Sequence, residues 1–169
     1  MESEFKDHVT QKIADFITDI GLELVNQRLD EETFLPGILV RSGSIVVDED
    51  KLRYPGDMLH EAGHLALAPG EIRPSLGGEV ALPGVSMEPI EAQAMAWSYA
   101  AALFIGIDPR IVFHQGGYFG ASESLLLNFS IGAYIGVTGL QEAGLTLFGE
   151  SARDKGIPSY PHMIKWLRD

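Results

Sequence analysis

Apolar residues recur at spacings of three and four along the first part of the chain. This repeat predicts one amphipathic helix over residues 5–29, and Gly21 is where we would expect any break in it. His8 falls within that helix, where a surface or packing role is expected rather than metal binding. The apolar positions of the repeat are Phe5, Val9, Ile13, Phe16, Ile17 and Ile20.

Two short runs of mainly β-branched residues follow, at residues 37–40 and 44–47. The turn-like sequence Arg-Ser-Gly between them predicts a β-hairpin. A second helix is expected to begin within residues 54–57. Pro55 suits a first helical turn, and Asp57 suits the positive end of the helix dipole.

Residues 89–105 are almost wholly apolar and predict a buried helix. The segment before it, residues 69–88, is rich in glycine and proline. A loop of this length is either a lid or binding loop beside a cleft, or a flexible crossover. The sequence leaves both interpretations open.

The C-terminal third has a weaker pattern. Asp108 and Pro109 predict a helix that reaches about His114, and a short helix is expected over residues 122–129. Residues 159–169 predict a basic helix at the end of the chain. Its inward-facing positions are Met163, Trp166 and Leu167.

Together these elements predict an α+β fold. We expect residues 1–169 to form a single domain that is mostly helical, with a small antiparallel β-sheet beside the helix that starts near Pro55. The length suits one domain with a sizeable core. A content of 46% hydrophobic and 21% charged residues is an ordinary globular balance.

The chain contains no cysteine and carries a formal net charge of −12. Disulfides, thiolate metal sites and cysteine nucleophiles are therefore excluded, and a general nucleic-acid-binding surface is disfavoured. The N-terminal residues show no leader pattern, and the uncharged, alanine-rich run at residues 92–107 is shorter than a membrane span. We expect a soluble, cytoplasmic protein without a membrane or nucleic-acid partner.

Residues 57–67 contain the pattern His-Glu-x-x-His, formed by His60, Glu61 and His64. Positions i and i+4 of a helix lie on one face, so both imidazoles can direct a nitrogen at one ion. Zinc accepts such nitrogens at about 2.0–2.1 Å and keeps a position for water at catalytic sites. Glu61 is then placed to act as general base towards that water. The uncharged flanking residues favour a partly buried site over a chance match on an exposed helix.

A catalytic site with two histidines needs a third ligand, and a carboxylate completes the known His₂Glu zinc set. Glu91, in the first turn of the apolar helix, is the leading candidate. Glu88 is a rival, although it precedes Pro89, which disfavours helical backbone at Glu88. Glu79, in the loop, is a third candidate. Without a metal, the helix dipole alone would account for Glu91.

A zinc hydrolase also needs a hydrogen-bond donor for the oxyanion that forms during attack. Tyr118 and His114, in the glycine-rich segment 114–120, are candidate transition-state donors, and Tyr54 is another. A flexible turn with a partly buried tyrosine is the plainer interpretation of this segment. His162 is not expected to bind metal, because nothing in the sequence brings it to the site.

The sequence His-Glu-Ala-Gly-His at residues 60–64, followed by Glu91, resembles the ImmA/IrrE-type metallopeptidase domains, which are gluzincin-like zincins. In that family H-E-x-G-H precedes a helix with the pattern E-x-x-A-x-x-[FW]-[AS]. The matching residues here are Glu91, Ala94, Trp97 and Ser98. The resemblance covers residues 37–103, implies a zincin-like fold, and favours Glu91 over Glu88 as third ligand. It extends neither to the C-terminal third nor to a helix-turn-helix module.

These observations predict a zinc-dependent metallopeptidase that hydrolyses peptide bonds in a peptide or protein substrate. His60, His64 and Glu91 would bind Zn²⁺, and Glu61 would be the general base. One alternative is a non-catalytic regulatory or protein-binding module that keeps the zincin fold. Another is a structural protein in which the motif is accidental. The sequence predicts neither a cleavage target nor an oligomeric state.

Overall fold

The computed structural model describes residues 4–78 and 87–169. Within these ranges six helices and three short strands form an α+β fold, which confirms the predicted class. The helices are α1 (His8–Asp19), α2 (Gly56–Leu67), α3 (Met87–Ile105), α4 (Ser122–Ser130), α5 (Val137–Glu142) and α6 (Glu150–Lys155). The strands are β1 (Leu24–Asn26), β2 (Ile38–Arg41) and β3 (Ser44–Val47).

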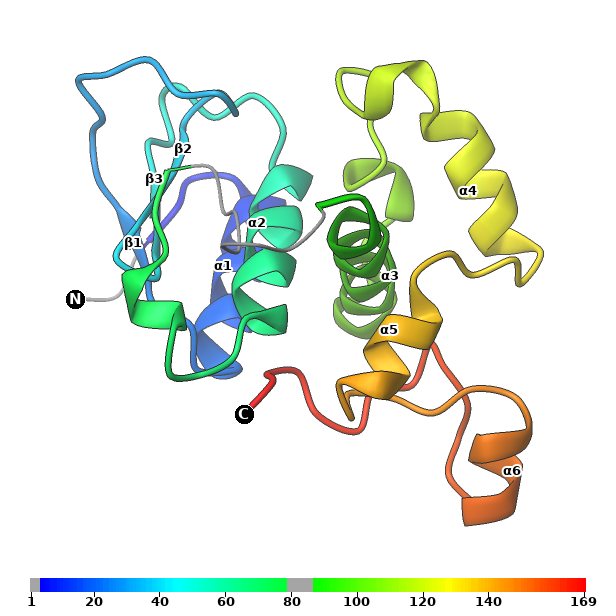
Figure 1. Cartoon of the computed structure of the whole chain (residues 1–169). Helices are drawn as coiled ribbons and strands as arrows, with labels where there is room; N and C mark the ends of the chain where they lie inside the picture. Colours follow the sequence, from blue (N-terminus) through cyan, green and yellow to red (C-terminus); the bar gives the residue numbers. More distant parts are fainter. Residues whose placement is uncertain (1–3, 79–86) are drawn as a thin grey trace.

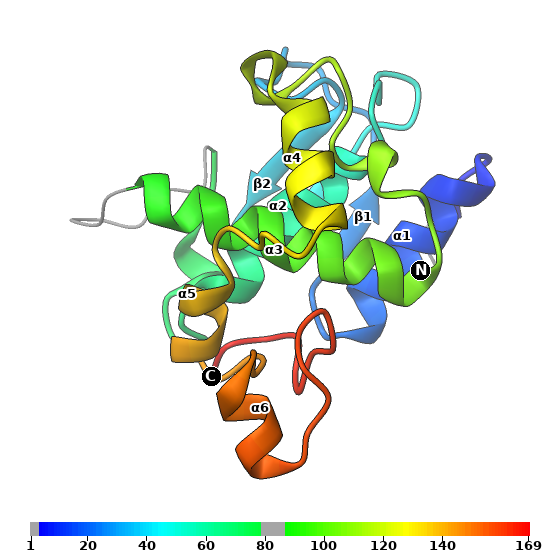
Figure 2. The same ribbon diagram turned by 90° about the vertical axis from the view of Figure 1, so that its right-hand side faces the viewer.

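The elements are arranged in layers, with α3 in the middle (Figure 1). The sheet, α1 and α2 lie on one side of α3, and α4 and α5 lie on its other side. Figure 2 shows the same arrangement from the α4 side. Helices α2 and α3 make the most extensive contact between any two elements of the described chain. The histidine motif and the leading third ligand therefore lie on adjacent helices.

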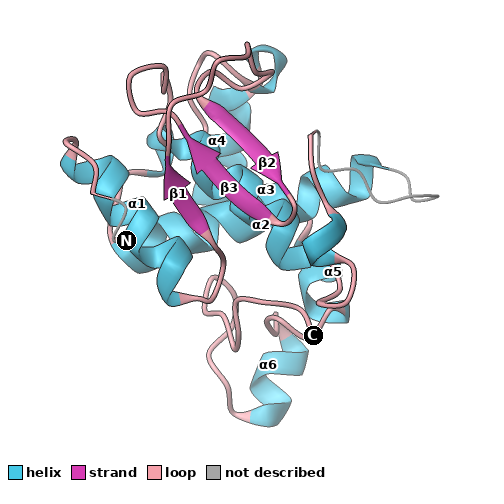
Figure 3. Ribbon diagram, turned by 90° about the vertical axis from the view of Figure 1, so that its left-hand side faces the viewer, coloured by secondary structure: helices cyan, strands magenta, loops and turns pink. Residues whose placement is uncertain are grey.

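The three strands pair in the order β1-β3-β2 (Figure 3). Strands β2 and β3 form the predicted antiparallel hairpin. Its two-residue turn has positive φ at Ser42 (51°) and Gly43 (77°), which is typical of a type I′ turn. Strand β1 pairs with β3 in parallel, with Leu24 opposite Ile45. The sheet is therefore mixed, and the prediction of an antiparallel sheet is wrong for β1.

Helix α1 is shorter than the helix predicted over residues 5–29. The Asp7 carboxylate caps its start by accepting a hydrogen bond from the Thr10 amide at 2.8 Å. The helix ends at Asp19, and Gly21 follows with a φ of +98°. This left-handed residue closes the helix, and the chain continues as β1.

Small residues allow α2 and α3 to pack closely. A Cβ atom at Gly63 would lie 3.3 Å from the Ala94 carbonyl oxygen and 3.2 Å from the Trp97 ring. The Ser98 hydroxyl donates to the Ala94 carbonyl at 2.7 Å and lies 3.2 Å from the Leu59 carbonyl oxygen of α2. Glycine at position 63 costs about 1 kcal/mol in helix propensity relative to alanine, and this approach of the α3 backbone explains its presence.

The last residues do not form the predicted helix, although their apolar side chains face inward as expected. Met163 is buried, and Trp166 packs edge-on against Trp97. The Trp97 indole donates to the Trp166 carbonyl at 3.0 Å. The Arg168 amide donates to the Ala66 carbonyl of α2 at 2.9 Å. Because these backbone groups bond to distant segments, the i to i−4 hydrogen bonds of a helix do not form.

Two further expectations need correction. A single 3₁₀ turn, η2 (Pro109–Ile111), stands in place of the predicted helix that reaches His114. Three residues beyond η2, His114 forms a hydrogen bond with Asp57 of α2. The predicted loop over residues 69–88 also contains a 3₁₀ turn, η1 (Arg73–Ser75). A role as a lid would depend on residues 79–86, which lie outside the described residues.

Helix α4 confirms the predicted helix over residues 122–129, and α3 confirms the predicted buried helix, which begins two residues earlier than expected. No helix in residues 4–78 and 87–169 combines the length and the apolarity that crossing a membrane requires.

The start of α2 should be intolerant of any side chain at position 56. A Cβ atom at Gly56 would overlap the Ile111 carbonyl group, which is backbone and has no rotamer to change. We expect Gly56→Ala to lower the free energy of unfolding by about 3 kcal/mol, measured by urea denaturation. Gly70→Ala is the matched control, because its Cβ would meet only an ordinary contact at 3.4 Å. Equal stability of the two variants would contradict the packing described.

Candidate metal centre

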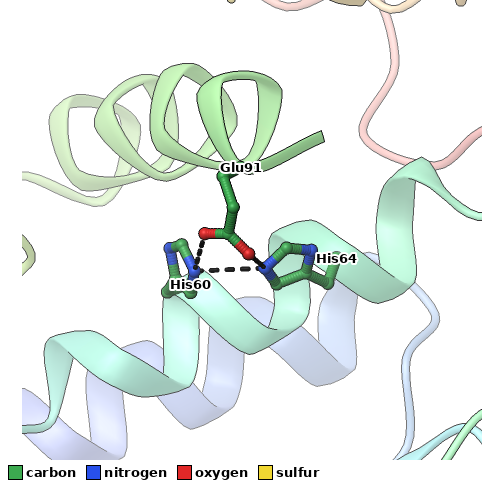
Figure 4. Close-up of side chains that lie close together, drawn as sticks. All are labelled: His60, His64 and Glu91. Atoms are coloured by element: carbon green, nitrogen blue, oxygen red, sulfur yellow. Dashed lines mark hydrogen bonds and ion pairs between the residues drawn. The ribbon is translucent and has the colours of Figure 1, made fainter. Parts of the chain in front are cut away.

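Three polar side chains from α2 and α3 converge on one point (Figure 4). His60 and His64 lie one helical turn apart on α2, and their Nε2 atoms are 3.1 Å apart. Glu91, in the first turns of α3, directs its carboxylate between them. Its Oε2 lies 3.1 Å from His60 Nε2, and its Oε1 lies 2.9 Å from His64 Nε2. The three residues therefore form a compact His₂Glu group.

The separations in this group suit a metal ion. Ligand atoms that surround zinc tetrahedrally at about 2.0–2.1 Å lie about 3.3 Å from one another, close to the distances here. One ligand atom from each residue lies within 4.8 Å of the others. The Nδ1 atoms of both histidines are buried and have no hydrogen-bond partner among the described residues. All polar contacts of the two rings are thus made through Nε2, the atom that faces Glu91.

The charges of the group are strongly coupled. Burial alone would raise the pKa of the Glu91 carboxyl, but hydrogen bonds from His60 and His64 lower it far below its usual range. Burial likewise disfavours protonated His60, yet the Glu91 carboxylate outweighs this and raises the pKa of His60 above 6.5. Glu91 is therefore a carboxylate throughout the physiological range, as a metal ligand must be.

Glu61 has a different environment from Glu91. It follows His60 directly on α2 and is only partly exposed to solvent. Burial raises the pKa of the Glu61 carboxyl, and the positive field of the histidines offsets this only in part. Its side chain makes no hydrogen bond to any residue within 4–78 or 87–169. The carboxylate is therefore free to exchange a proton with a molecule that enters the site.

The structure separates the two predicted donors. Tyr118 lies at the site, where its ring packs edge-on against His60 with a centroid separation of 6.0 Å. Burial is the largest cause of a raised pKa at the Tyr118 hydroxyl, so it keeps its proton. His114 Nε2 instead lies 2.6 Å from Asp57 Oδ1. Tyr54, the third candidate, stacks on His114 with ring centroids 3.8 Å apart.

The other candidate residues do not join the group. Glu88 is exposed and helical at the start of α3, so the expected effect of the following proline does not hold. Glu79 lies outside the described residues. His8 and His162 are exposed and lie outside the group formed by His60, His64 and Glu91.

Asp57 is a polar residue of this region that the sequence assigned only to the helix dipole. It is buried, with 6% of its surface exposed, and it occupies the first turn of α2. The position of Asp57 relative to the histidine motif could have indicated that it belongs to this region. Asp57 precedes His60 by three positions and Glu61 by four, so it shares the face of α2 that carries the motif.

Neither a protein-family model, nor a curated protein, nor a solved structure matches this chain. The interpretation of the site therefore depends on its own residues and geometry. Membership of the ImmA/IrrE-type family stays a prediction from the sequence motif.

The pairing of His60 with Glu91 gives the metal-free protein a testable dependence on pH. Because folding raises the pKa of His60, the stabilisation is fully present below pH 6.5 and is lost as the pH rises through the raised value. Glu91→Gln should remove this dependence. In urea denaturation of chelator-treated protein, we expect the variant to be less stable than wild type at pH 6, with a smaller difference at pH 9.

Glu88→Gln is the control for this comparison, since it removes an exposed carboxylate from the same turn of α3. Its free energy of unfolding should depend on pH in the same way as that of the wild type. If the difference in free energy of unfolding between wild type and Glu91→Gln grew from pH 6 to pH 9, the pairing of His60 with Glu91 would be contradicted.

Proposed function

We propose that this protein is a zinc-dependent metallopeptidase with a zincin-like domain, in which His60, His64 and Glu91 bind the metal. The observation that carries the proposal is the convergence of two imidazole nitrogens and one carboxylate from two helices. Glu61, the residue next to the first histidine, supplies a second carboxylate with a separate role. This donor set and spacing are those of known catalytic zinc sites.

Zinc bound by this set would polarise the scissile carbonyl and lower the pKa of water enough to supply a nucleophile near neutral pH. The protein's own residues would perform the remaining steps. Glu61 would take a proton from the attacking water and pass it to the nitrogen of the leaving amine. Its raised pKa brings it closer to the working pH, which favours both transfers.

The two carboxylates of the site would divide the work according to their environments. Glu91 is held as a carboxylate by two histidines, which suits a permanent ligand. Glu61 has no such partner within the described residues, and its carboxylate can gain and lose a proton during one reaction cycle. A pair of acidic groups with pKa values displaced in opposite directions is typical of acid–base sites.

Tyr118 would donate a hydrogen bond to the oxyanion that develops on the scissile carbonyl. It packs against His60 and keeps its hydroxyl proton at neutral pH. The substrate class is a peptide or protein, since the residues in place serve carbonyl attack followed by protonation of an amine. A zincin-like module that binds zinc without turnover is the alternative, and the experiment below distinguishes the two.

The direct test is Glu61→Gln in zinc-loaded protein. Glutamine has nearly the same shape but cannot accept the proton, so zinc content should stay at the wild-type level. Cleavage of a quenched-fluorescence peptide library should fall about 10²- to 10⁴-fold in kcat. Glu71→Gln is the matched control, because Glu71 is exposed and lies just beyond the end of α2. Its activity should be unchanged.

Two results would contradict the proposal. Full activity in Glu61→Gln would remove the assigned base. Zinc-loaded wild-type protein that cleaves no member of the library would favour the non-catalytic module.

A further inference from the structure

A second polar cluster adjoins the metal centre on the same face of α2. Asp57 lies one turn before His60, and its Oδ1 is 2.6 Å from His114 Nε2. Both side chains are about nine-tenths buried, with 9% of the Asp57 and 11% of the His114 side chain exposed. An acid–imidazole pair this close and this buried resists separation, because either group alone would lose its partner away from water.

The pair lies where the glycine-rich segment, residues 114–120, meets α2. Tyr54, which precedes the helix, stacks on the His114 ring at an interplanar angle of 6°. A Cβ atom at Gly116 would overlap the Tyr54 ring, and one at Gly117 would lie 3.2 Å from the His114 ring. The glycines therefore let the segment fold tightly over both rings.

Beyond these glycines the backbone is strained. Tyr118 and Phe119 have φ values of 58° and 50°, a left-handed region that residues with a side chain rarely adopt. The Phe119 side chain is fully exposed and contributes no packing. The Tyr118 ring contacts Phe113 and His60, with centroids 5.3 Å and 6.0 Å away. Such strain persists only where the neighbouring contacts hold the segment in place.

The hydrogen bond to Asp57 also determines what His114 can donate. The His114 Nε2 atom faces Asp57 Oδ1 at 2.6 Å, so that nitrogen is not available to a substrate. His114 Nδ1 is buried and has no partner among the described residues. The Tyr118 ring, in contrast, packs edge-on against His60 at the metal centre. The two donors predicted from the sequence are therefore not equivalent.

We propose that Asp57 and His114 are positioning residues that hold residues 114–120 against α2, so that Tyr118 alone reaches the reacting carbonyl oxygen. This inference rests on the proposed hydrolytic function for the role of Tyr118. Whether the Asp57–His114 pair holds the segment can be tested without measuring peptide cleavage.

The first measurement is hydrogen–deuterium exchange of zinc-loaded protein, followed by mass spectrometry of peptides that cover residues 114–121. Asp57→Asn and His114→Gln should each raise exchange in this segment roughly ten- to hundred-fold, as expected for loss of a charge-assisted hydrogen bond. Exchange in α3 and zinc content should not change. The controls are Asp154→Asn and His162→Gln, which alter exposed side chains far along the chain from the pair.

The second measurement is a double-mutant cycle on kcat, with the library peptide that wild type cleaves best. Tyr118→Phe should reduce kcat while leaving exchange in residues 114–121 unchanged. If Asp57 acts through Tyr118, the double variant Asp57→Asn/Tyr118→Phe should be no slower than Tyr118→Phe alone. A purely structural role for Asp57 would instead lower both activities by the same factor.

Unchanged exchange in both Asp57→Asn and His114→Gln would overturn the inference, and so would effects on kcat that multiply in the double variant. Absence of cleavage by wild type would overturn the hydrolytic function and the donor role of Tyr118. In that case the exchange result still decides whether the pair holds the segment, so the two failures are distinguishable.

Discussion

The close approach of α2 and α3 is the contact on which the candidate site depends. Gly63 allows the α3 backbone near Ala94 to lie against α2, and one turn earlier on α3 the Glu91 side chain then reaches both histidines. A larger residue at position 63 would push the helices apart and move the carboxylate away from His60 and His64. The Glu91 carboxylate is therefore positioned by a helix contact that contains none of the three candidate ligands.

The same contact explains why two chemically identical carboxylates differ. Glu91 projects from α3 into the space between two imidazoles and is paired. Glu61 projects from α2 beside them and is desolvated without a partner within the described chain. Their pKa values are displaced in opposite directions for this reason. The contrast between the paired Glu91 and the unpaired Glu61 thus follows from the way in which α2 and α3 pack.

Local sequence patterns were enough to predict the parts of the structure that depend on neighbours in sequence. The hairpin of β2 and β3, the helix that carries His60 and His64, and the buried helix α3 all agree with it. These patterns could not identify the candidate third ligand, because the rival Glu88 is only three residues from Glu91. The resemblance favoured Glu91, and the helix crossing is what brings Glu91 to the histidines.

The errors came from pairings between distant segments. Strand β1 has only three residues, and it exists because it pairs with β3. The C-terminal residues would suit a helix by their pattern, but the Arg168 amide bonds to Ala66 of α2. The Asp57–His114 pair joins residues 57 positions apart, so no local pattern revealed it.

We propose that His60, His64 and Glu91 together bind one zinc ion. The most direct measurement is elemental mass spectrometry of untagged protein, comparing wild type with His64→Ala, Glu91→Gln and the exposed control Glu88→Gln. The structure predicts about one zinc ion per chain in wild type and in Glu88→Gln, with zinc lost or greatly weakened in the other two. Wild-type protein that retains no zinc after reconstitution, or a Glu91→Gln variant that retains it as tightly as wild type, would contradict a zinc site formed by these three residues.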